Sequence, residues 1–183
     1  YSPAPDFLFK PPTSYMLFPW PEETGPNRYR RALYTFRRRS TPYPVLLTFD
    51  TPSGDNACVR RQLSNTPLQA LVTLNETLFV EAARALGRKM VEVGGKDDAE
   101  RLTFAFRCAT SRRPTERELG HLQSLLEKQR RRIAEGWINA AELGTGKKDV
   151  PADLPGGVNP ADLAACAAAA RVILNLDETI TRE

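Results

Sequence analysis

Apolar residues recur at steps of three and four over much of the chain after residue 66, which is the spacing of an amphipathic helix. The clearest run consists of Leu68, Leu71, Val72, Leu78, Phe79, Ala82, Leu86 and Met90. Thr66 is a suitable N-cap for this run, and Pro67 suits the first helical position because its missing amide donor costs nothing there. The pattern therefore predicts one long helix, which Gly94 and Gly95 end.

Two more helices follow, each with a capping-box sequence at its start. Asp97 and Glu100 precede an apolar stripe that predicts a helix over residues 98–111. Thr115 and Glu118 begin the next helix. The inward residues of the two helices are Leu102, Ala105, Phe106 and Ala109, then Leu119, Leu122, Leu126 and Ile133.

The last helix is expected to start at Asn159–Pro160 and to run to Leu176, with an alanine face that permits unusually close packing against a neighbour. A polar loop over 144–157, which contains Gly and Pro, precedes it and is expected to be mobile up to about residue 158. A further helix is predicted from residue 27. The fold class is therefore all-α, an irregular bundle of about five helices.

The first 26 residues hold seven of the fifteen prolines, so extended chain is expected there. Their apolar side chains are too numerous for a solvated linker; among them are Phe7, Phe9, Tyr15, Met16, Leu17, Phe18 and Trp20. We expect residues 1–26 to form an arm wrapped on a single helical domain of residues 27–183. Because the chain opens on Tyr1 within this irregular stretch, it is interpreted as a fragment of a longer protein. The run Val45–Leu46–Leu47 predicts a brief strand or a buried loop.

Composition is that of a globular protein, with 41% hydrophobic and 26% charged residues. No apolar run approaches the roughly 20 residues that span a bilayer. The net charge of +4 is concentrated before residue 149. Cys58, Cys108 and Cys166 lie far apart without CxxC or CxxCH spacing, and His121 is the only histidine, so neither a zinc site nor a haem is expected in this chain. Cys108 and Cys166 are predicted to act as small apolar residues.

Six arginines and three aromatic residues, but no acid, occupy residues 28–39. Arginine beside aromatic rings suits phosphate, carboxylate or sulfate recognition, and also nucleic-acid stacking. Arg30, Arg31 and Tyr34 are the candidates for such contact. The alternative, which we favour, is that these arginines pair with carboxylates as scaffolding. Nucleic acid is the least favoured partner because the chain is only mildly basic.

Residues 50–65 form a second polar junction, with Asp50, Cys58, Arg60, Arg61 and Asn65 as candidates for ligand or partner contact. Asp50 paired with an arginine would fix the loop against the helix start. Neighbouring arginines could favour the Cys58 thiolate, but no histidine lies nearby to serve as its base. A structural junction is therefore favoured over a catalytic one, and no catalytic residue is assigned.

Asp177 and Glu178 close the chain after the last predicted helix, where the helix dipole disfavours acids. A distant partner is therefore expected, and Arg30 or Arg31 is the candidate.

Four motifs resemble the C-terminal half of the planctomycete domain of unknown function 1553: YRRALYTF, TFDTPSGDNACVRR, NTPLQALVTLNETLFVEAARAL and ARVILNLDETITRE. The resemblance covers residues 28–183. It implies a secreted or periplasmic multidomain protein, often with a cytochrome c module that carries the haem. Ala32 stands where many relatives have serine, which excludes a serine nucleophile at that position.

Two functions remain open. The first is a helical scaffold or interaction domain that contacts other domains of the same polypeptide or an anionic polysaccharide. The second is part of an enzyme, glycan-processing or redox-linked, whose site is shared with upstream domains.

Overall fold

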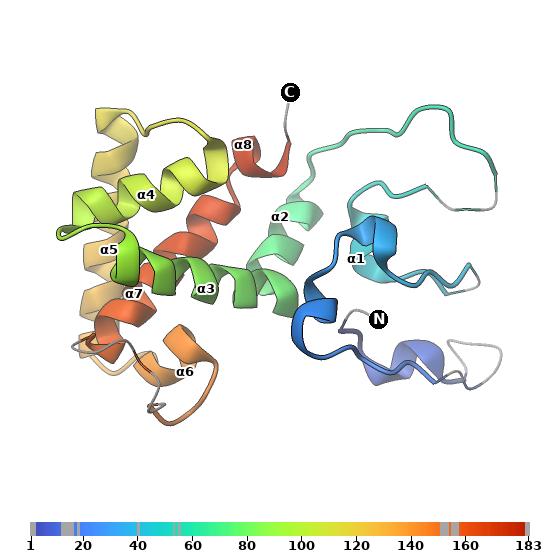
Figure 1. The fold of residues 1–183 in the computed structure, drawn as a ribbon, viewed down its shortest axis with the longest axis horizontal. Helices are drawn as coiled ribbons and strands as arrows, with labels where there is room; N and C mark the ends of the chain where they lie inside the picture. The colour runs from blue at the N-terminus through green and yellow to red at the C-terminus, as the bar shows by residue number, and fades with distance from the viewer. Residues whose placement is uncertain are drawn as a thin grey trace. The chain divides into compact units, whose positions relative to one another are not determined.

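The computed structural model describes residues 3–11, 17, 19–39, 41–52, 54, 56–150, 154 and 158–181. The chain divides into two compact units, residues 1–72 and residues 73–183, which are described separately below. Eight α-helices and three short 3₁₀ helices, with no strand, make up the regular structure of these described residues (Figure 1). The predicted all-α class is confirmed.

The second unit is built around one alanine-rich helix. Its elements are α3 (Thr77–Val93), α4 (Asp98–Thr110), α5 (Glu116–Ala134), α6 (Ala140–Thr145), α7 (Pro160–Leu174) and α8 (Asp177–Ile180). Helix α7, red-orange in Figure 1, contacts each of the other five. Its buried residues are Leu163, Ala164, Ala165, Cys166, Ala167, Ala169, Ala170 and Ile173. Apart from Leu163 and Ile173 these side chains are small, so α7 can accept neighbours at short range.

The closest approach is between α3 and α7. A Cβ atom on Gly87 would lie 2.7 Å from the Ala167 Cα atom and 2.7 Å from its backbone nitrogen. Real Cβ contacts with backbone are longer than this, and backbone cannot move aside as a flexible side chain can. Glycine in α3 is therefore required for the observed distance between the helices.

Side-chain caps start the helices where the sequence predicted them. The Asp97 side chain accepts a hydrogen bond from the backbone N–H of Glu100 at 2.8 Å. Thr115 and Glu118 form the full reciprocal capping box at the start of α5. The Asn159 side chain accepts from the backbone N–H of Ala161, which begins α7 at Pro160.

An ion cluster connects the ends of three helices. Arg130, near the end of α5, donates from Nη2 to Asp98 Oδ1 at 2.9 Å and from Nε to Asp162 Oδ1 at 2.9 Å. Asp98 and Asp162 lie in the first turns of α4 and α7, where the helix dipole also favours an acid. The hydrogen bond from Arg130 holds the pKa of Asp98 below its usual value.

The C-terminal acids differ from the prediction. Helix α7 ends at Leu174 and a new helix, α8, begins at Asp177, so both acids lie in a first turn and suit the dipole instead of opposing it. Glu178 accepts two hydrogen bonds from Arg112, each of 2.7 Å, and Arg112 also binds Glu118. The long-range partner of Glu178 is therefore Arg112. The predicted contact of Arg30 or Arg31 with this segment stays a prediction.

Two other expectations in the second unit were wrong. The polar loop was placed from residue 144, but residues 140–145 form helix α6, because the Asn139 side chain caps Glu142 and Gly146 ends the helix at a φ of +79°. Cys166 is buried as predicted, whereas Cys108 is exposed because it lies on the outer side of α4. Much of the predicted mobile loop, 151–153 and 155–157, lies outside the described residues.

The first unit has short helices joined by extended chain. They are η1 (Asp6–Phe9), η2 (Gly25–Tyr29), η3 (Ala32–Tyr34), α1 (Pro44–Thr48) and the start of α2 (Pro67–Asn75). The predicted helix from residue 27 is therefore wrong. Arg30 and Arg31 are extended, with ψ near 147° and 148°. Six arginines without an acid allow no i,i+4 ion pair within this segment to support a longer helix.

Two further corrections concern helix boundaries. The run from Val45 to Leu47 belongs to helix α1, which starts with Pro44 at its first position, and is neither strand nor loop. The long helix predicted from Pro67 starts and ends as expected but is interrupted at Glu76. That residue is extended, and its side chain caps α3 by accepting from the Leu78 N–H at 2.8 Å. Leu68 and Leu71 are consequently exposed instead of continuing the apolar stripe of α3.

The proline-rich segment packs its aromatic rings together. The Phe9 ring, 2% exposed, stacks on Trp20 with centroids 4.1 Å apart, and Trp20 meets Phe36 edge to face at 5.9 Å. Tyr15, Met16 and Phe18 lie outside the described residues. The predicted division between an arm and a helical domain at residue 26 stays a prediction.

None of the helices in the described part of the chain is long and apolar enough to cross a membrane.

We predict that Gly87→Ala destabilises the second unit by about 2–3 kcal/mol, because the new methyl group forces α3 away from the backbone of α7. The matched control is Gly120→Ala in α5, where a Cβ atom meets nothing within 4 Å. That change should be neutral or stabilise by up to about 1 kcal/mol through helix propensity. Urea unfolding followed by far-UV circular dichroism measures both. Equal stabilities for the two variants would contradict the inferred close approach.

Candidate functional site

Helix α2 begins with a reciprocal cap that joins Thr66 and Gln69. The Thr66 backbone N–H donates to Gln69 Oε1 at 3.0 Å, and the Gln69 N–H donates to Thr66 Oγ1 at 3.3 Å. This is a capping box in which glutamine takes the usual place of glutamate. It fixes the Gln69 side chain toward the loop that precedes the helix.

The Gln69 amide connects three parts of that loop. Its Nε2 donates to the Thr48 carbonyl oxygen at 2.9 Å, to Ser64 Oγ at 3.1 Å and more weakly to Asp50 Oδ2 at 3.4 Å. The residue is only 1% exposed, so few water molecules could replace these bonds. We call Thr48, Asp50, Ser64, Thr66 and Gln69 the polar joint.

Asp50 supplies the charge of the polar joint. Its Oδ2 accepts from Ser64 Oγ at 2.7 Å and from the Ser64 backbone N–H at 2.8 Å. These two bonds lower the pKa of the carboxyl group against the opposing effect of burial, and the Gln69 hydrogen bond and the charge of Arg61 add smaller contributions in the same direction. Asp50 also has a φ of +55°, a conformation that aspartate tolerates better than most residues. Asp50 fixes the loop against the helix start as anticipated, but its hydrogen bonds come from neutral donors and not from an arginine.

One arginine of the basic segment over 28–39 reaches the turn after Asp50. Arg37 donates to the Pro52 carbonyl oxygen. Its guanidinium carbon would lie 3.3 Å from a Cβ atom on Gly54, which has a φ of +82°. Glycine suits position 54 because of this conformation, and Arg37 packs closely against it.

The other predicted candidates are exposed. Cys58, Arg60, Arg61 and Asn65 lie on irregular chain between the turn and α2. The Cys58 thiol donates to the Arg60 carbonyl oxygen at 3.3 Å, which makes it part of a local turn. Arg61 acts on Asp50 through charge.

Arg30, Arg31 and Tyr34 form a separate exposed group. Arg30 donates from Nε and Nη2 to the Asn27 side chain at 2.9 and 2.7 Å. The Arg31 guanidinium lies 5.9 Å from the centre of the Tyr34 ring, a cation–π distance. Of the predicted site residues, Asp50 lies in the polar joint, four lie on the exposed chain that precedes α2, and these three form a separate basic group.

The hydrogen bonds of the polar joint connect its members to one another. Ser64 and Gln69 both donate to Asp50, and Gln69 also donates to Ser64. A search of the described residues finds no group of three His, Cys, Asp or Glu side chains that could hold a metal ion. The hydrogen bonds of Gln69 hold the irregular chain over 49–66 against the start of α2.

Of the neutral members of the polar joint, Thr66 was identified from the sequence as an N-cap, but Thr48, Ser64 and Gln69 were not identified. The signal for Gln69 was present, since Thr66 followed three residues later by glutamine is a capping-box pattern. Ser64 and Arg37 carried no comparable signal, because their partners are backbone groups or residues fourteen or more positions away.

The family described as "Protein of unknown function (DUF1553)" matches residues 5–126 of the chain. The matched stretch includes the polar joint, the basic segment and helices α1 to α4. No curated protein and no solved structure matches.

Replacing the buried Gln69 with leucine should destabilise the first unit by about 2–3 kcal/mol, because the partly buried Thr48 carbonyl and Thr66 N–H lose their partner. The control is Gln62→Leu, which changes an exposed glutamine of the same loop and should cost less than about 0.5 kcal/mol. A Trp137→Phe background leaves Trp20 as the sole indole, so its fluorescence during urea unfolding reports the first unit. A Gln69→Leu stability equal to that of the control would rule out the proposed role.

Asp50→Asn should weaken the first unit near neutral pH and have a decreasing effect in acid. Asparagine also tolerates positive φ and can offer one oxygen to Ser64, so the change removes mainly the charge. Because the folded pKa of Asp50 is lowered, its stabilisation is complete above the unfolded pKa of about 3.9 and is lost as the pH falls through the folded pKa. Urea titrations at several pH values, with Asp149→Asn as an exposed control, measure the difference. A wild-type advantage that persists at the lowest pH would contradict this assignment.

Proposed function

The chain belongs to the DUF1553 family of proteins of unknown function, and from that premise we propose that it is a helical scaffold and interaction domain within a longer polypeptide. Its partner is another domain of the same polypeptide, which binds the basic surface of the first unit. We define that surface by Tyr29, Arg30, Arg31, Leu33 and Tyr34.

The observation that carries this proposal is the exposure of large apolar side chains beside arginines. Leu33 is 81% exposed, Tyr29 61% and Tyr34 60%, all within six residues of chain. Grouped exposed apolar residues are characteristic of interaction surfaces, and tyrosine and arginine are enriched at their centres. The surface lies on two short 3₁₀ helices and the extended chain between them, and its side chains point outward.

The charge of this surface indicates the complementary chemistry of the partner. The segment over 28–39 contains no acid, and Arg28 is neutralised by Glu22, whereas Arg30 and Arg31 contact an amide and a ring. A partner surface with carboxylates around an apolar centre would pair with both components.

The polar joint supports a scaffold over a catalytic role. Its donors and acceptor satisfy one another, so it holds the loop that bears Cys58, Arg60, Arg61 and Asn65 in place without leaving a reactive group. These four exposed residues extend the proposed contact surface.

The cellular setting is part of the proposal and rests on the family resemblance. We propose a planctomycete-type exported protein, secreted or periplasmic, in which a neighbouring cytochrome c module carries any haem. An anionic polysaccharide is the competing occupant of the basic surface.

Hydrogen exchange tests the proposal in the full-length polypeptide. We predict that backbone amides over 28–39 exchange at least about tenfold more slowly there than in the 183-residue chain alone, since a partner domain covers them. Leu33→Ser combined with Tyr34→Ser should abolish the difference. Trp137→Ser, which alters an equally exposed residue (79%) of the second unit, should leave it intact.

Two results would refute this assignment. One is equal exchange over 28–39 in the two proteins. The other is slowing of the same amides by polygalacturonate added to the isolated chain, with no slowing by the neighbouring domains.

A further inference from the structure

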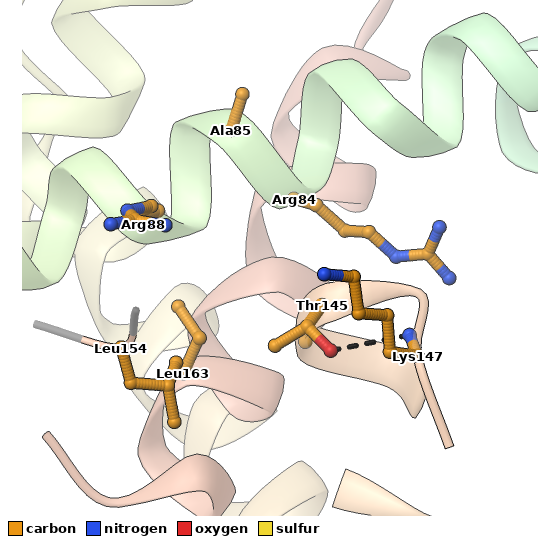
Figure 2. Close-up of a pocket in the computed structure, with 8 residues that line it drawn as sticks. Arg84, Ala85, Arg88, Thr145, Lys147, Leu154 and Leu163 are labelled. Atoms are coloured by element: carbon orange, nitrogen blue, oxygen red, sulfur yellow. Dashed lines mark hydrogen bonds between the residues drawn. The ribbon is translucent and has the colours of Figure 1, made fainter. Parts of the chain in front are cut away.

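A pocket of about 220 Å³ opens on the second unit between α3, α6 and α7. It lies within one unit and shares no residue with the polar joint or the basic surface. Its lining residues are Arg84, Ala85, Arg88, Gly144, Thr145, Lys147, Leu154 and Leu163. Figure 2 shows Arg84 and Arg88 along one helix, and Lys147 rising toward that helix from the turn after α6.

Arg84 is held rigidly at this pocket. Its Nε donates to the Leu143 carbonyl oxygen at 3.0 Å and its Nη2 to the Glu142 carbonyl oxygen at 3.0 Å. A Cβ atom at position 146 would lie 2.9 Å from Arg84 Nη1, and Gly146 has a φ of +79°, so glycine there leaves room for the guanidinium. The two carbonyls engage one edge of the group, and Nη1 remains for another acceptor.

The turn after α6 positions the third cation. Thr145 Oγ1 donates to the Ala141 carbonyl oxygen at 2.7 Å and accepts from the Lys147 backbone N–H at 3.2 Å, the bond drawn in Figure 2. This bond fixes the backbone of Lys147, and the side chain extends from that point toward α3 (Figure 2). The Thr145 hydroxyl is thereby engaged and acts as support for the pocket.

The charge around the pocket is unbalanced. Among the described residues that line it there are three cations and no acid, and Arg88 donates from Nε to Glu92 of the same helix at 2.8 Å. Two positive charges, those of Arg84 and Lys147, then face the pocket without a carboxylate among the described lining residues. Like charges gathered at one opening repel, and a bound anion relieves that repulsion.

The rest of the lining is apolar or small. Leu163 of α7, Ala85 and the buried Gly144 supply carbon surface next to the cations. The volume is below the range of about 300–1,000 Å³ typical of drug-sized ligands. The pocket therefore fits a compact molecule that has an anionic end and a short carbon skeleton.

We propose that this pocket binds a small organic oxoanion, in which a phosphate, sulfate or carboxylate group lies between Arg84 and Lys147 and the carbon skeleton lies against Leu163. Arginine offers paired donors to such groups, and lysine adds a point charge.

Calorimetric titration at an ionic strength of about 0.15 M tests the proposal with four probes: inorganic phosphate, glucose 6-phosphate, glucuronate and uncharged glucose. Glucose 6-phosphate or glucuronate should bind about fivefold or more tightly than inorganic phosphate, and glucose should not bind. Lys147→Gln should weaken binding about fivefold, the effect of one partly exposed charge contact. Lys148→Gln removes the same charge from the next residue, which does not line the pocket, and should change affinity by less than about twofold.

Backbone amide chemical shifts, recorded by NMR during the titration, then locate the bound molecule. The proposal requires the largest changes at Thr145, Lys147 and Arg84. It is overturned if no charged probe binds, if Lys147→Gln and Lys148→Gln weaken binding equally, or if the largest shifts fall on the arginines over 28–39.

Discussion

The second unit depends on the close contact between α3 and α7. Gly87 removes the only atom that would keep the two backbones apart, and alanines on α7 extend this close approach along the helix. Most buried side chains of α7 are alanines, and each of them has little apolar area to bury. Helix α7 therefore gains stability mainly from close packing against many neighbouring helices. This explains why five helices surround it and why the larger core residues, such as Met90, Leu102, Phe106 and Leu126, come from the surrounding helices.

Ion clusters complete this arrangement at the helix ends. Arg130 joins the first turns of α4 and α7, and Arg112 joins the start of α5 to α8 while lying 4.8 Å from the Phe106 ring centre. Exposed pairs of this kind contribute little energy individually. Their contribution here is directional, since each arginine connects helix starts that the apolar core alone would leave free to rotate.

Local signals were sufficient for the starts of α2, α4, α5 and α7 and insufficient for the other helix starts and for longer-range structure. Thr66–Pro67, Thr115 with Glu118, and Asn159–Pro160 each combine a cap with a suitable first residue, and each helix begins there. The segment over 28–39 has helical apolar spacing, but its six arginines lack acids to offset them, and periodicity takes no account of charge. The break at Glu76 was missed because its apolar stripe continues on both sides.

The same limit applies to the candidate site. The candidates over 50–65 were mainly charged residues and a cysteine, because these side chains carry most site chemistry. Among them, Asp50 lies in the polar joint and accepts hydrogen bonds from Ser64 and Gln69. Its decisive partners, Ser64 and Gln69, are neutral, and their bonds depend on a loop that closes over fourteen to nineteen residues. Arg84 and Lys147 were not identified at all, since they are 63 positions apart and ordinary in composition.

The balance of donors and acceptors separates the two polar regions by function. In the polar joint one carboxylate oxygen, buried amide groups and hydroxyls meet in nearly matched numbers, so an added ligand would have to break existing bonds before forming its own. In the pocket the described lining residues include three cations and no acid, which is the balance that the proposed anion would complement. Asp50, which was singled out from the sequence, therefore lies where hydrogen bonds hold a loop to α2. The proposed ligand site instead lies where α3, α6 and α7 bring together Arg84 and Lys147, two basic residues that were not selected from the sequence. In the proposed function the polar joint would serve indirectly, by holding the exposed loop of the first unit in a fixed shape for a partner.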